Sequence, residues 1–259
     1  MKTYRGAFHL HSRYSYDGQL SLQEIVPLLK KKGVSFALMT EHAYHRIEKR
    51  FLSTSEFSRF IQDCQSQSSP DFLLIPGLEF ACHNNQVHIV GTPLQQPFSL
   101  ESLDKPDKIL EAIRREGGLA ILVHPFFGSA YRRLKKEEFL CLDGFEIWNY
   151  GYQGLQGPSL VEYLKFSDWL KTLCPDSRAL VGMDLHHAGG IAELYIELEL
   201  EALKPELIFQ KIRERSYRLA ALQRNFSPQG ELRGLLSHLA TREVARIKRI
   251  FRRIYKDNI

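Results

Sequence analysis

The sequence has few of the features that mark disulfide scaffolds, secreted proteins or membrane proteins. Its four cysteines are scattered along 259 residues without close pairing, so neither a disulfide framework nor a cysteine-rich zinc site is expected. The longest apolar stretches, such as residues 119–123, have the length of a strand and are too short to cross a bilayer. The first residues contain no apolar core of signal-peptide length. We therefore expect a reduced, cytoplasmic protein without a transmembrane segment.

The chain also lacks an internal repeat, a low-complexity segment and a linker rich in Pro, Gly and Ser. Its composition, 44% hydrophobic and 25% charged residues, is that of an ordinary globular protein with a sizeable core. The net charge of +5 comes wholly from residues 231–259, which hold eight basic and three acidic residues. We expect one domain over residues 1–222 and a basic, amphipathic helical extension over residues 223–259. A helix packed on the domain is the favoured interpretation, and contact with nucleic acid or a membrane surface stays open.

Short apolar runs alternate with longer amphipathic ones. Amphipathic helices are expected over residues 21–33, 105–118 and 159–173, the first of them with the Ser21–Glu24 pattern of a capping box. The alternation is typical of βαβ units and predicts a mostly parallel α/β fold, for which a barrel fits better than two separate domains. Strands are expected at 6–10, 35–40, 72–80, 86–92, 119–125, 144–149, 179–185 and 194–200.

Residues able to bind metal recur where these strands end. His9 and His11 lie two apart on the first strand, so their side chains share one face, and Asp184 and His186 repeat that spacing. Because catalytic groups of a parallel barrel gather at the carboxyl ends of its strands, we expect these side chains to meet. The whole set has six histidines and three carboxylates: His9, His11, Asp17, His42, Glu79, His88, His124, Asp184 and His186.

Each of these residues alone has an ordinary explanation. A single histidine such as His42, His88 or His124 more often forms a hydrogen bond or caps a helix than binds an ion, and Asp184 could cap the following turn. These ordinary explanations do not account for the convergence of nine such residues at one end of the predicted fold. Imidazole and carboxylate together are the ligands of Zn, Mn or Fe, so the sequence predicts a centre of divalent ions and leaves the metal open.

The motifs HLHS followed by Asp17, TEH, PGLE, HIVG, VHP and GMDLH resemble, in this order, those of the PHP (polymerase and histidinol phosphatase) superfamily. The resemblance covers residues 1–200 and implies a distorted (β/α)7 barrel with up to three metal ions. Glu41 stands where the family commonly has Asp, at a position not expected to bind metal. As the resemblance implies, one ion would be held by His9, His11, Glu79 and Asp184, a second by Glu79, His88 and His124, and a third by Asp17, His42 and His186.

The resemblance implies a metal-dependent phosphoesterase acting on a small phosphorylated metabolite or nucleotide. The ions would activate a water molecule as the nucleophile, so no nucleophilic Ser or Cys is required. One alternative is an exonuclease or RNase of the same superfamily that uses the basic tail to attract nucleic acid. Another is a non-catalytic accessory module, which the intact ligand set disfavours.

Four residues near the strand ends are candidates for binding substrate. Guanidinium groups suit phosphate oxygens, although surface arginines are more often simply solvated. The loops at 44–70 and 126–140 are expected to select the substrate, but they match no known pattern. Neither the natural substrate nor the oligomeric state follows from the sequence. The four candidates are Arg13, Arg132, Arg133 and Asn149.

Overall fold

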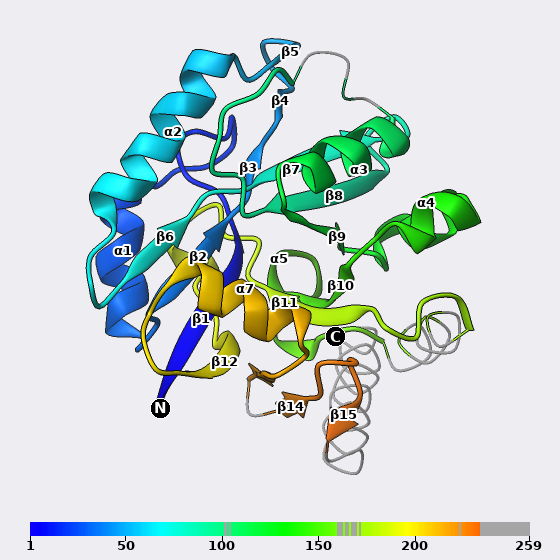
Figure 1. Cartoon of the computed structure of the whole chain (residues 1–259). Coiled ribbons are helices and arrows are strands. Elements are labelled where there is room, and N and C mark those ends of the chain that lie inside the picture. Colours follow the sequence, from blue (N-terminus) through cyan, green and yellow to red (C-terminus); the bar gives the residue numbers. More distant parts are fainter. Residues whose placement is uncertain are drawn as a thin grey trace, which may run out of the picture.

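Two β-sheets with helices packed around them form the protein (Figure 1). The computed structural model describes residues 1–100, 103, 105–159, 163, 166, 170, 172–222 and 224–233. The predicted strand at 72–80 is divided at Pro76 and Gly77 into two strands, and each of the other predicted strands is present. Among the described residues, no helix is both long and apolar enough to cross a membrane.

The first sheet is built around β1 (Lys2–Leu10), the strand that carries the His-x-His pair. On one side, β1 pairs in parallel with β2 (Phe36–Met39), which pairs in parallel with β6 (Leu73–Ile75). On the other side it pairs antiparallel with β12 (Leu194–Leu200). Three short antiparallel strands extend the sheet beyond β12: β13 (Arg218–Ala221), β14 (Arg224–Phe226) and β15 (Leu232–Arg233).

The second sheet contains one strand that runs against the predicted direction. Parallel pairs join β3 to β7, and join β9, β10 and β11, but β8 is antiparallel to both of its neighbours. The four residues 83–86 between β7 and β8 are too few for a parallel crossover and form a hairpin. The order of strands is β11 (Arg178–Gly182), β10 (Gly144–Asn149), β9 (Leu119–Val123), β8 (Val87–Thr92), β7 (Leu78–Cys82) and β3 (Glu41–His42).

Main-chain hydrogen bonds join the two sheets at one end. The amide of Met183, just after β11, donates to the carbonyl of Phe8 at 2.9 Å, and the amide of His11 donates to the carbonyl of Leu185 at 2.9 Å. β3 follows directly on β2, so one continuous stretch of chain belongs to both sheets. The ends of β1, β3 and β11 are thereby held next to one another.

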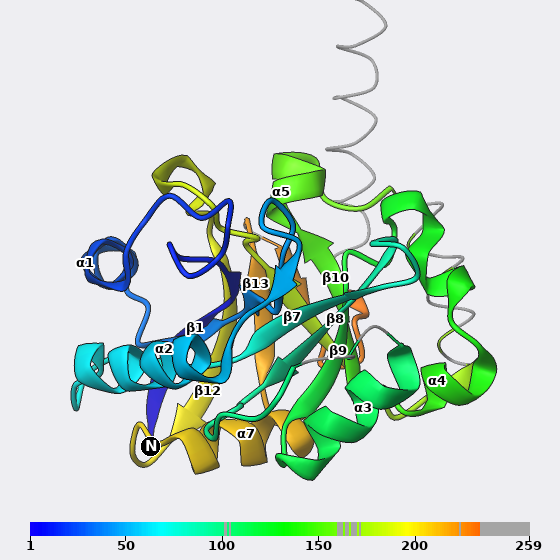
Figure 2. The ribbon, with the colours of Figure 1, turned by 90° about the horizontal axis from the view of Figure 1, so that it is seen from above.

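Helices cover the outer faces of the sheets (Figure 2). α1 (Leu22–Lys31) begins with the predicted Ser21–Glu24 capping box and buries Leu22, Ile25 and Leu29. α3 (Pro106–Arg115) lies where a helix was expected. Two of the longer helices were not predicted, α2 (Thr54–Gln67) and α7 (Pro205–Arg213). α2 occupies most of the stretch that we interpreted as a substrate-selecting loop.

Short elements follow several strands. The hairpin of β4 (Tyr44–His45) and β5 (Arg50–Phe51) follows β3. The 3₁₀ segment η1 (Phe127–Arg133) and α4 (Lys136–Leu140) follow β9, so the predicted loop at 126–140 is mostly helical. α5 (Tyr150–Gln153) and η2 (Gly154–Gln156) follow β10, and η3 (Ala188–Gly190) follows β11.

Two expectations concern the C-terminal part of the chain: the domain boundary after residue 222 and the helices over 159–173 and in the basic tail. The first sheet continues through β14 and β15, so the boundary expected after residue 222 falls within a sheet rather than beyond it. Most of the helix expected over 159–173, and all of the chain after residue 233 where the basic helix is expected, lie outside the described residues.

Candidate metal centre

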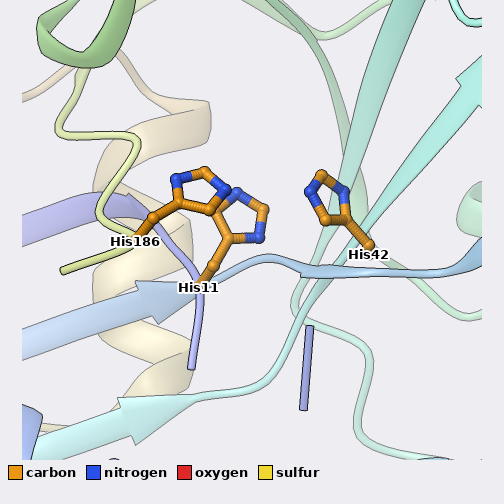
Figure 3. Close-up of side chains that lie close together, drawn as sticks. All are labelled: His11, His42 and His186. Atoms are coloured by element: carbon orange, nitrogen blue, oxygen red, sulfur yellow. The ribbon is translucent and has the colours of Figure 1, made fainter. Parts of the chain in front are cut away.

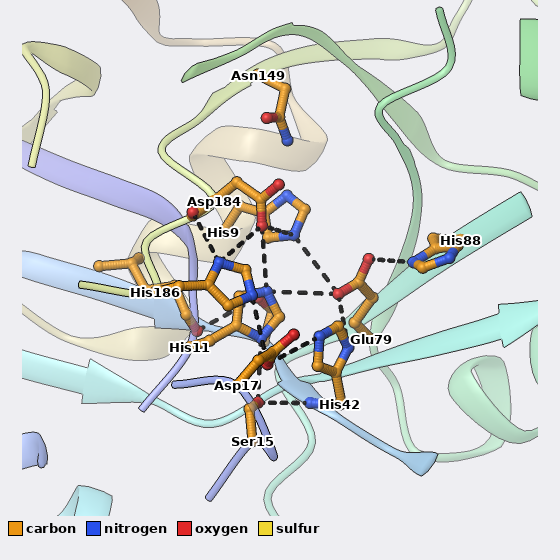
Figure 4. Close-up of polar contacts among 12 residues, drawn as sticks. His9, His11, Ser15, Asp17, His42, Glu79, His88, Asn149, Asp184 and His186 are labelled. Atoms are coloured by element: carbon orange, nitrogen blue, oxygen red, sulfur yellow. Dashed lines mark hydrogen bonds and ion pairs between the residues drawn. The ribbon is translucent and has the colours of Figure 1, made fainter. Parts of the chain in front are cut away.

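The nine predicted residues meet in one place, beside the ends of β1, β3 and β11 and the start of β7 (Figure 4). Their spatial convergence is as expected, although His88 reaches the cluster in a different way. It lies near the start of β8 and not at a strand end. Because β8 is antiparallel to β7, its first residues lie beside the last residues of β7.

The centre of the cluster contains His9, His11, Glu79 and Asp184. Glu79 Oε2 lies 3.7 Å from His9 Nε2 and 3.4 Å from His11 Nε2. Asp184 Oδ1 lies 3.4 Å and 3.5 Å from the same two nitrogens. Ligands of a tetrahedral ion with bonds of about 2.1 Å lie about 3.4 Å apart, so each of these four contacts has about the length expected between two ligands of one ion. Ligand atoms of His9, His11 and Asp184 lie within 4.8 Å of one another, as do those of His9, Glu79 and His124.

A second group forms on the other oxygen of Glu79. Oε1 lies 2.6 Å from His88 Nδ1 and 3.1 Å from His124 Nε2. The two imidazole rings meet edge to face, with centroids 4.9 Å apart. The carboxylate of Glu79 therefore faces two groups of histidines at once, the arrangement that a carboxylate bridging two ions requires.

The third group contains Asp17, His42 and His186. Asp17 Oδ1 lies 3.4 Å from Nε2 of His42 and 3.4 Å from Nε2 of His186. His11 belongs to this group by position, because its ring stacks on both imidazoles with centroids 4.4 Å away (Figure 3). Ligand atoms of His11, His42 and His186 lie within 4.8 Å of one another. His11 thus adjoins both the central and the third group.

Several polar atoms in the cluster are buried without a hydrogen-bond partner among the described residues. Such atoms cost free energy unless something compensates for the lost solvation. Imidazole nitrogens and carboxylate oxygens that converge at about 3.4 Å are well suited to divalent cations, so the donor set fits metal ions. The uncompensated atoms are His9 Nε2, His11 Nε2, Asp17 Oδ1 and Glu79 Oε2.

Protonation compensates for part of this burial in the metal-free protein. Burial by itself lowers the pKa of His42, but the carboxylates of Glu79 and Asp17 raise it to about 10. Burial lowers the pKa of His11 to about 3, helped by the positive charge of neighbouring His42. Burial opposes ionisation of Glu79, but His88 and His42 keep the pKa of Glu79 well below its usual range. Metal binding would therefore displace protons, most clearly from His42.

Three of the nine residues have a left-handed backbone. The φ angles of His9, His124 and Asp184 are 65°, 34° and 51°. Residues other than Gly rarely adopt this conformation, which costs about 1–3 kcal/mol each and is concentrated at functional sites. At His9 the pairing of β1 with β2 also shifts register, the mark of a bulge that redirects a side chain.

The structure shows a supporting residue that the sequence analysis did not identify, Glu146 on β10. Its Oε1 lies 2.9 Å from His9 Nδ1, and its Oε2 accepts from the amide of His124 at 2.8 Å. These contacts orient two of the predicted ligands. Gly182 makes room for them, because a Cβ atom there would collide with the Glu146 carboxylate. Glu146 is fully buried, and such a residue in the middle of an apolar strand is itself a sequence signal.

Glu41 and Ser15 form a second supporting network. Ser15 Oγ donates to Glu41 Oε2 at 2.6 Å and lies 3.1 Å from His11 Nδ1. Glu41 also accepts two hydrogen bonds from the amide of Ser12, at 2.9 and 3.0 Å. Burial raises the pKa of Glu41, and the hydrogen bonds from the two serines oppose that shift. The residue that departs from the family motif thus holds the loop between His11 and Asp17.

The four candidate substrate-binding residues have different surroundings. Asn149 is buried next to the cluster, where its Nδ2 donates to Glu146 Oε2 at 2.9 Å and its Oδ1 caps α5 through the amide of Tyr152. Arg13 is largely exposed and lies 3.3 Å from Glu24 Oε2. Arg132 and Arg133 are exposed, and Arg132 donates to the hydroxyl of Tyr131 at 3.0 Å. The structure therefore places Asn149 next to the cluster and leaves the arginines on the surface.

A cavity of about 680 Å³ is lined by the β4–β5 hairpin, the end of β7 with the turn that follows it, and the start of α3. Its wall includes Ala81, the cross-strand partner of His88, and Tyr44, two residues beyond His42. Arg46 and Lys105 give it positive charge, which the sequence analysis did not associate with the site. An anionic substrate would be attracted to such a cavity.

No family model matches the sequence, and neither does any curated protein. Solved structures do share its fold. A two-domain protein from Bacteroides vulgatus that contains a predicted PHP-like metal-dependent phosphoesterase superposes with a TM-score of 0.63 and 17% identity, over 85% of this chain and 65% of that one. A lesion-specific endonuclease from Pyrococcus furiosus matches with a TM-score of 0.53 and 15% identity, over 82% of this chain and 56% of that one.

An amidohydrolase from Chromobacterium violaceum has the same fold, with a TM-score of 0.51 and 15% identity, over 84% of this chain and 98% of that one. The chain spans less than two thirds of the length of both the Bacteroides and the Pyrococcus protein. At these identities the likeness concerns the fold, which is PHP-like, as the motifs predicted. The names of the three proteins cover different reactions, so the reaction has to be argued from the site.

Proposed function

We propose that this chain is a metal-dependent phosphoesterase of the PHP superfamily that hydrolyses a small phosphorylated metabolite or nucleotide. The observation that carries the proposal is the cluster of unpartnered buried atoms on His9, His11 and Glu79, which lie about as far apart as ligands of a shared ion. The PHP-like fold supports it independently of the motifs.

We assign up to three divalent ions of Zn, Mn or Fe to the three groups of ligand atoms. The central ion would be held by His9, His11, Glu79 and Asp184. A second would share Glu79 with His88 and His124, and a third would be held by Asp17, His42 and His186, with His11 alongside. The main-chain bonds that join the two sheets support a distorted seven-stranded barrel as the frame around the ions.

When bound, such ions lower the pKa of a water molecule and neutralise the oxygens of a phosphoryl group. The chain's own residues set the conditions for this chemistry. Glu146 fixes the orientation of His9, and Ser15 fixes that of His11, so that both present Nε2 to the centre. Tight packing around the fully buried His9 and His11 keeps bulk water away from their rings. The geometry provides no nucleophilic role for a side chain, and the mechanism needs none.

Substrate binding is proposed for both predicted and newly found residues. Arg46 and Lys105, in the cavity beside His88, are placed to attract an anionic substrate. Arg13, Arg132 and Arg133 remain candidates that would have to swing towards a bound substrate. Asn149 would act through Glu146, because both ends of its amide are engaged with the protein.

A nuclease is the second candidate function. The observation that favours it is the fold shared with the lesion-specific endonuclease from Pyrococcus furiosus. Binding to nucleic acid that weakens steeply with salt and is lost on deletion of residues 234–259 would support a nuclease over a small-molecule phosphatase. A non-catalytic module is disfavoured, because every ligand position holds a residue able to bind metal.

The proposal is tested with the full chain, purified without chelator and supplied with Mn²⁺. We expect hydrolysis of an aryl phosphate that is abolished by a chelator and by Asp184→Ala. The matched control is Asp176→Ala, which removes an exposed carboxylate of the same size and should leave the rate unchanged. Circular dichroism establishes whether each variant is folded.

The substrate class follows from comparing kcat/KM for phosphomonoesters, cyclic nucleotides and short oligonucleotides. Preference for monoesters supports a phosphatase, and release of mononucleotides from an end supports an exonuclease. If the protein binds its full complement of metal and cleaves none of these compounds, the phosphoesterase proposal is wrong.

A further inference from the structure

Two large aromatic side chains are exposed immediately beside the metal centre. Phe127 is 56% exposed and Tyr152 is 50% exposed, although both are rings of a kind that proteins usually bury. They come from different elements, since Phe127 begins η1 after β9 and Tyr152 lies in α5 after β10. Figure 2 shows α5 beyond the end of β10.

The two rings belong to a run of tilted ring contacts that begins at a predicted metal ligand. The centroid of the Tyr152 ring lies 4.8 Å from that of His124, and the centroid of the Phe127 ring lies 4.6 Å from that of Tyr152. The interplanar angles are 52° and 41°. These distances are those of favourable ring contacts, so the Phe127–Tyr152 pair has a defined position relative to the metal centre.

The backbone that presents Phe127 is unusual. Gly128 and Ser129 both have left-handed φ angles, of 55° and 54°, directly after the exposed ring. For Ser129 this conformation is costly, and such strain recurs in segments that hold a ligand.

We infer that the Phe127–Tyr152 pair is a platform on which the substrate stacks a planar ring, and that this ring is a nucleobase. The inference rests on the proposed phosphoesterase function and narrows its substrate class. Of the two substrates proposed above, a nucleotide has a planar ring within a few bonds of its phosphoryl group. A phosphoryl group held beside His124 would bring that ring towards Tyr152. Stacking accepts any base, because each base has a π-face.

The test compares two substrates that differ only in the ring. Adenosine 5′-monophosphate and ribose 5-phosphate release the same kind of primary alcohol, so the ratio of their kcat/KM values isolates the contribution of the base. With Mn²⁺-loaded full chain we expect this ratio to fall about tenfold in Tyr152→Ala and in Phe127→Ala. Tyr152→Phe, which keeps the ring, should retain the ratio.

Leu140→Ala is the matched control, since it removes a 51% exposed apolar side chain from α4. Its ratio should equal that of the unmodified protein. The platform is overturned if neither Tyr152→Ala nor Phe127→Ala changes the ratio of kcat/KM values, or if Leu140→Ala lowers that ratio as much as they do.

A short oligonucleotide with a 5′-phosphate distinguishes the source of the base. Preference for it over the mononucleotide assigns the platform to a nucleic-acid end, and the reverse preference assigns it to a free nucleotide.

Binding separates failure of this inference from failure of the proposed function. If the protein hydrolyses neither substrate, the phosphoesterase proposal fails, and saturation-transfer NMR with adenosine 5′-monophosphate decides the platform. Saturation of the base protons that is lost in Tyr152→Ala upholds stacking. Saturation confined to the ribose, or none, overturns it.

Discussion

Glu146 illustrates how a residue outside the predicted ligand set can orient members of that set. Its carboxylate contacts His9 Nδ1, accepts from the amide of His124 and accepts from Asn149. A hydrogen bond at Nδ1 fixes the ring orientation of a ligating histidine and makes its Nε2 a better donor to the ion.

The first prediction concerns Glu146→Gln. The amide keeps the shape of the side chain and removes its charge, so the affinity for the central ion should fall about 10- to 100-fold. Competition with a chromophoric chelator measures this affinity. Glu199→Gln, at an exposed position of β12, is the control and should leave the affinity unchanged. An equal affinity in both variants would show that Glu146 does not support the site.

The second prediction concerns the stability of the chelated protein as a function of pH. The pKa of His42 is raised to about 10 in the folded protein, against 6.5 as its ordinary value. Its protonation therefore adds stability that is complete below about pH 6.5 and is lost as the pH rises through 10. Urea unfolding in the presence of a chelator should give a free energy of unfolding that declines over this range.

His42→Gln is the variant that isolates this effect, because it removes the titrating group and keeps a polar side chain. Its stability should decline less between pH 6.5 and 10 than that of the unmodified chain. Parallel curves for the two proteins would mean that His42 is not protonated in the metal-free state.

The members of the cluster could be predicted from sequence because all but Asp17 are histidines or acids at or near an end of a strand, and Asp17 lies in the loop that follows β1. Their supporting residues could not be found in the same way. Ser15 is an ordinary loop serine until the fold brings it within 3.1 Å of His11 Nδ1. Phe127 and Tyr152 resemble core aromatics in the sequence, and only their exposure distinguishes them.

At the scale of elements, the pattern of strands was predictable, but the direction of β8 was not. Hydrophobic runs give the position of a strand and carry no information on its partner. The local signal for a tight turn was the pair of asparagines in the connection between β7 and β8. Asn84 and Asn85 both adopt left-handed φ angles, of 56° and 64°, which suit such a turn. The hairpin brings His88 beside Glu79, so this turn contributes directly to the site.

α2 shows a second limit of sequence interpretation. Its core-facing residues are Phe57, Phe60, Ile61 and Cys64, a helical spacing within a segment otherwise rich in Ser and Gln. This segment belongs to the stretch 44–70, which was expected to be a loop and matched no known pattern. The capping box at Ser53 and Glu56 was the available sign of a helix start.

The third prediction tests that cap. Ser53→Ala removes the side chain that accepts from the amide of Glu56, so the free energy of unfolding should fall by about 1 kcal/mol. Thr54→Ala at the next position is the control and should have little effect. Thermal and urea denaturation both measure the difference. If Ser53→Ala is as stable as the control, the cap contributes nothing to the fold.

At the scale of the whole molecule, the two sheets concentrate buried charge at one end. The cluster joins residues from Asp17 to His186, so segments far apart in the chain depend on one another there. In the metal-free protein these segments are held by apolar packing, hydrogen bonds and the partly protonated ion pairs of the cluster. Bound ions would add direct links between β1, β7 and the chain after β11. Metal binding should therefore stabilise the entire fold and not only its loops.

The last prediction concerns how much metal binding raises the stability of the folded chain. An ion that binds the folded chain alone adds about 2.7 kcal/mol per site when its free concentration is one hundred times its Kd. For a protein of this length that corresponds to a rise in Tm of about 5–10 °C on adding Mn²⁺ to the chelated protein. Calorimetry measures the shift. Asp184→Ala should reduce it by removing a ligand of the central ion, whereas Asp176→Ala, on an exposed surface, should retain it. A Tm that is the same with chelator and with excess Mn²⁺ would contradict a metal centre that spans the fold, because ions bound between β1, β7 and β11 cannot leave the unfolding equilibrium unchanged.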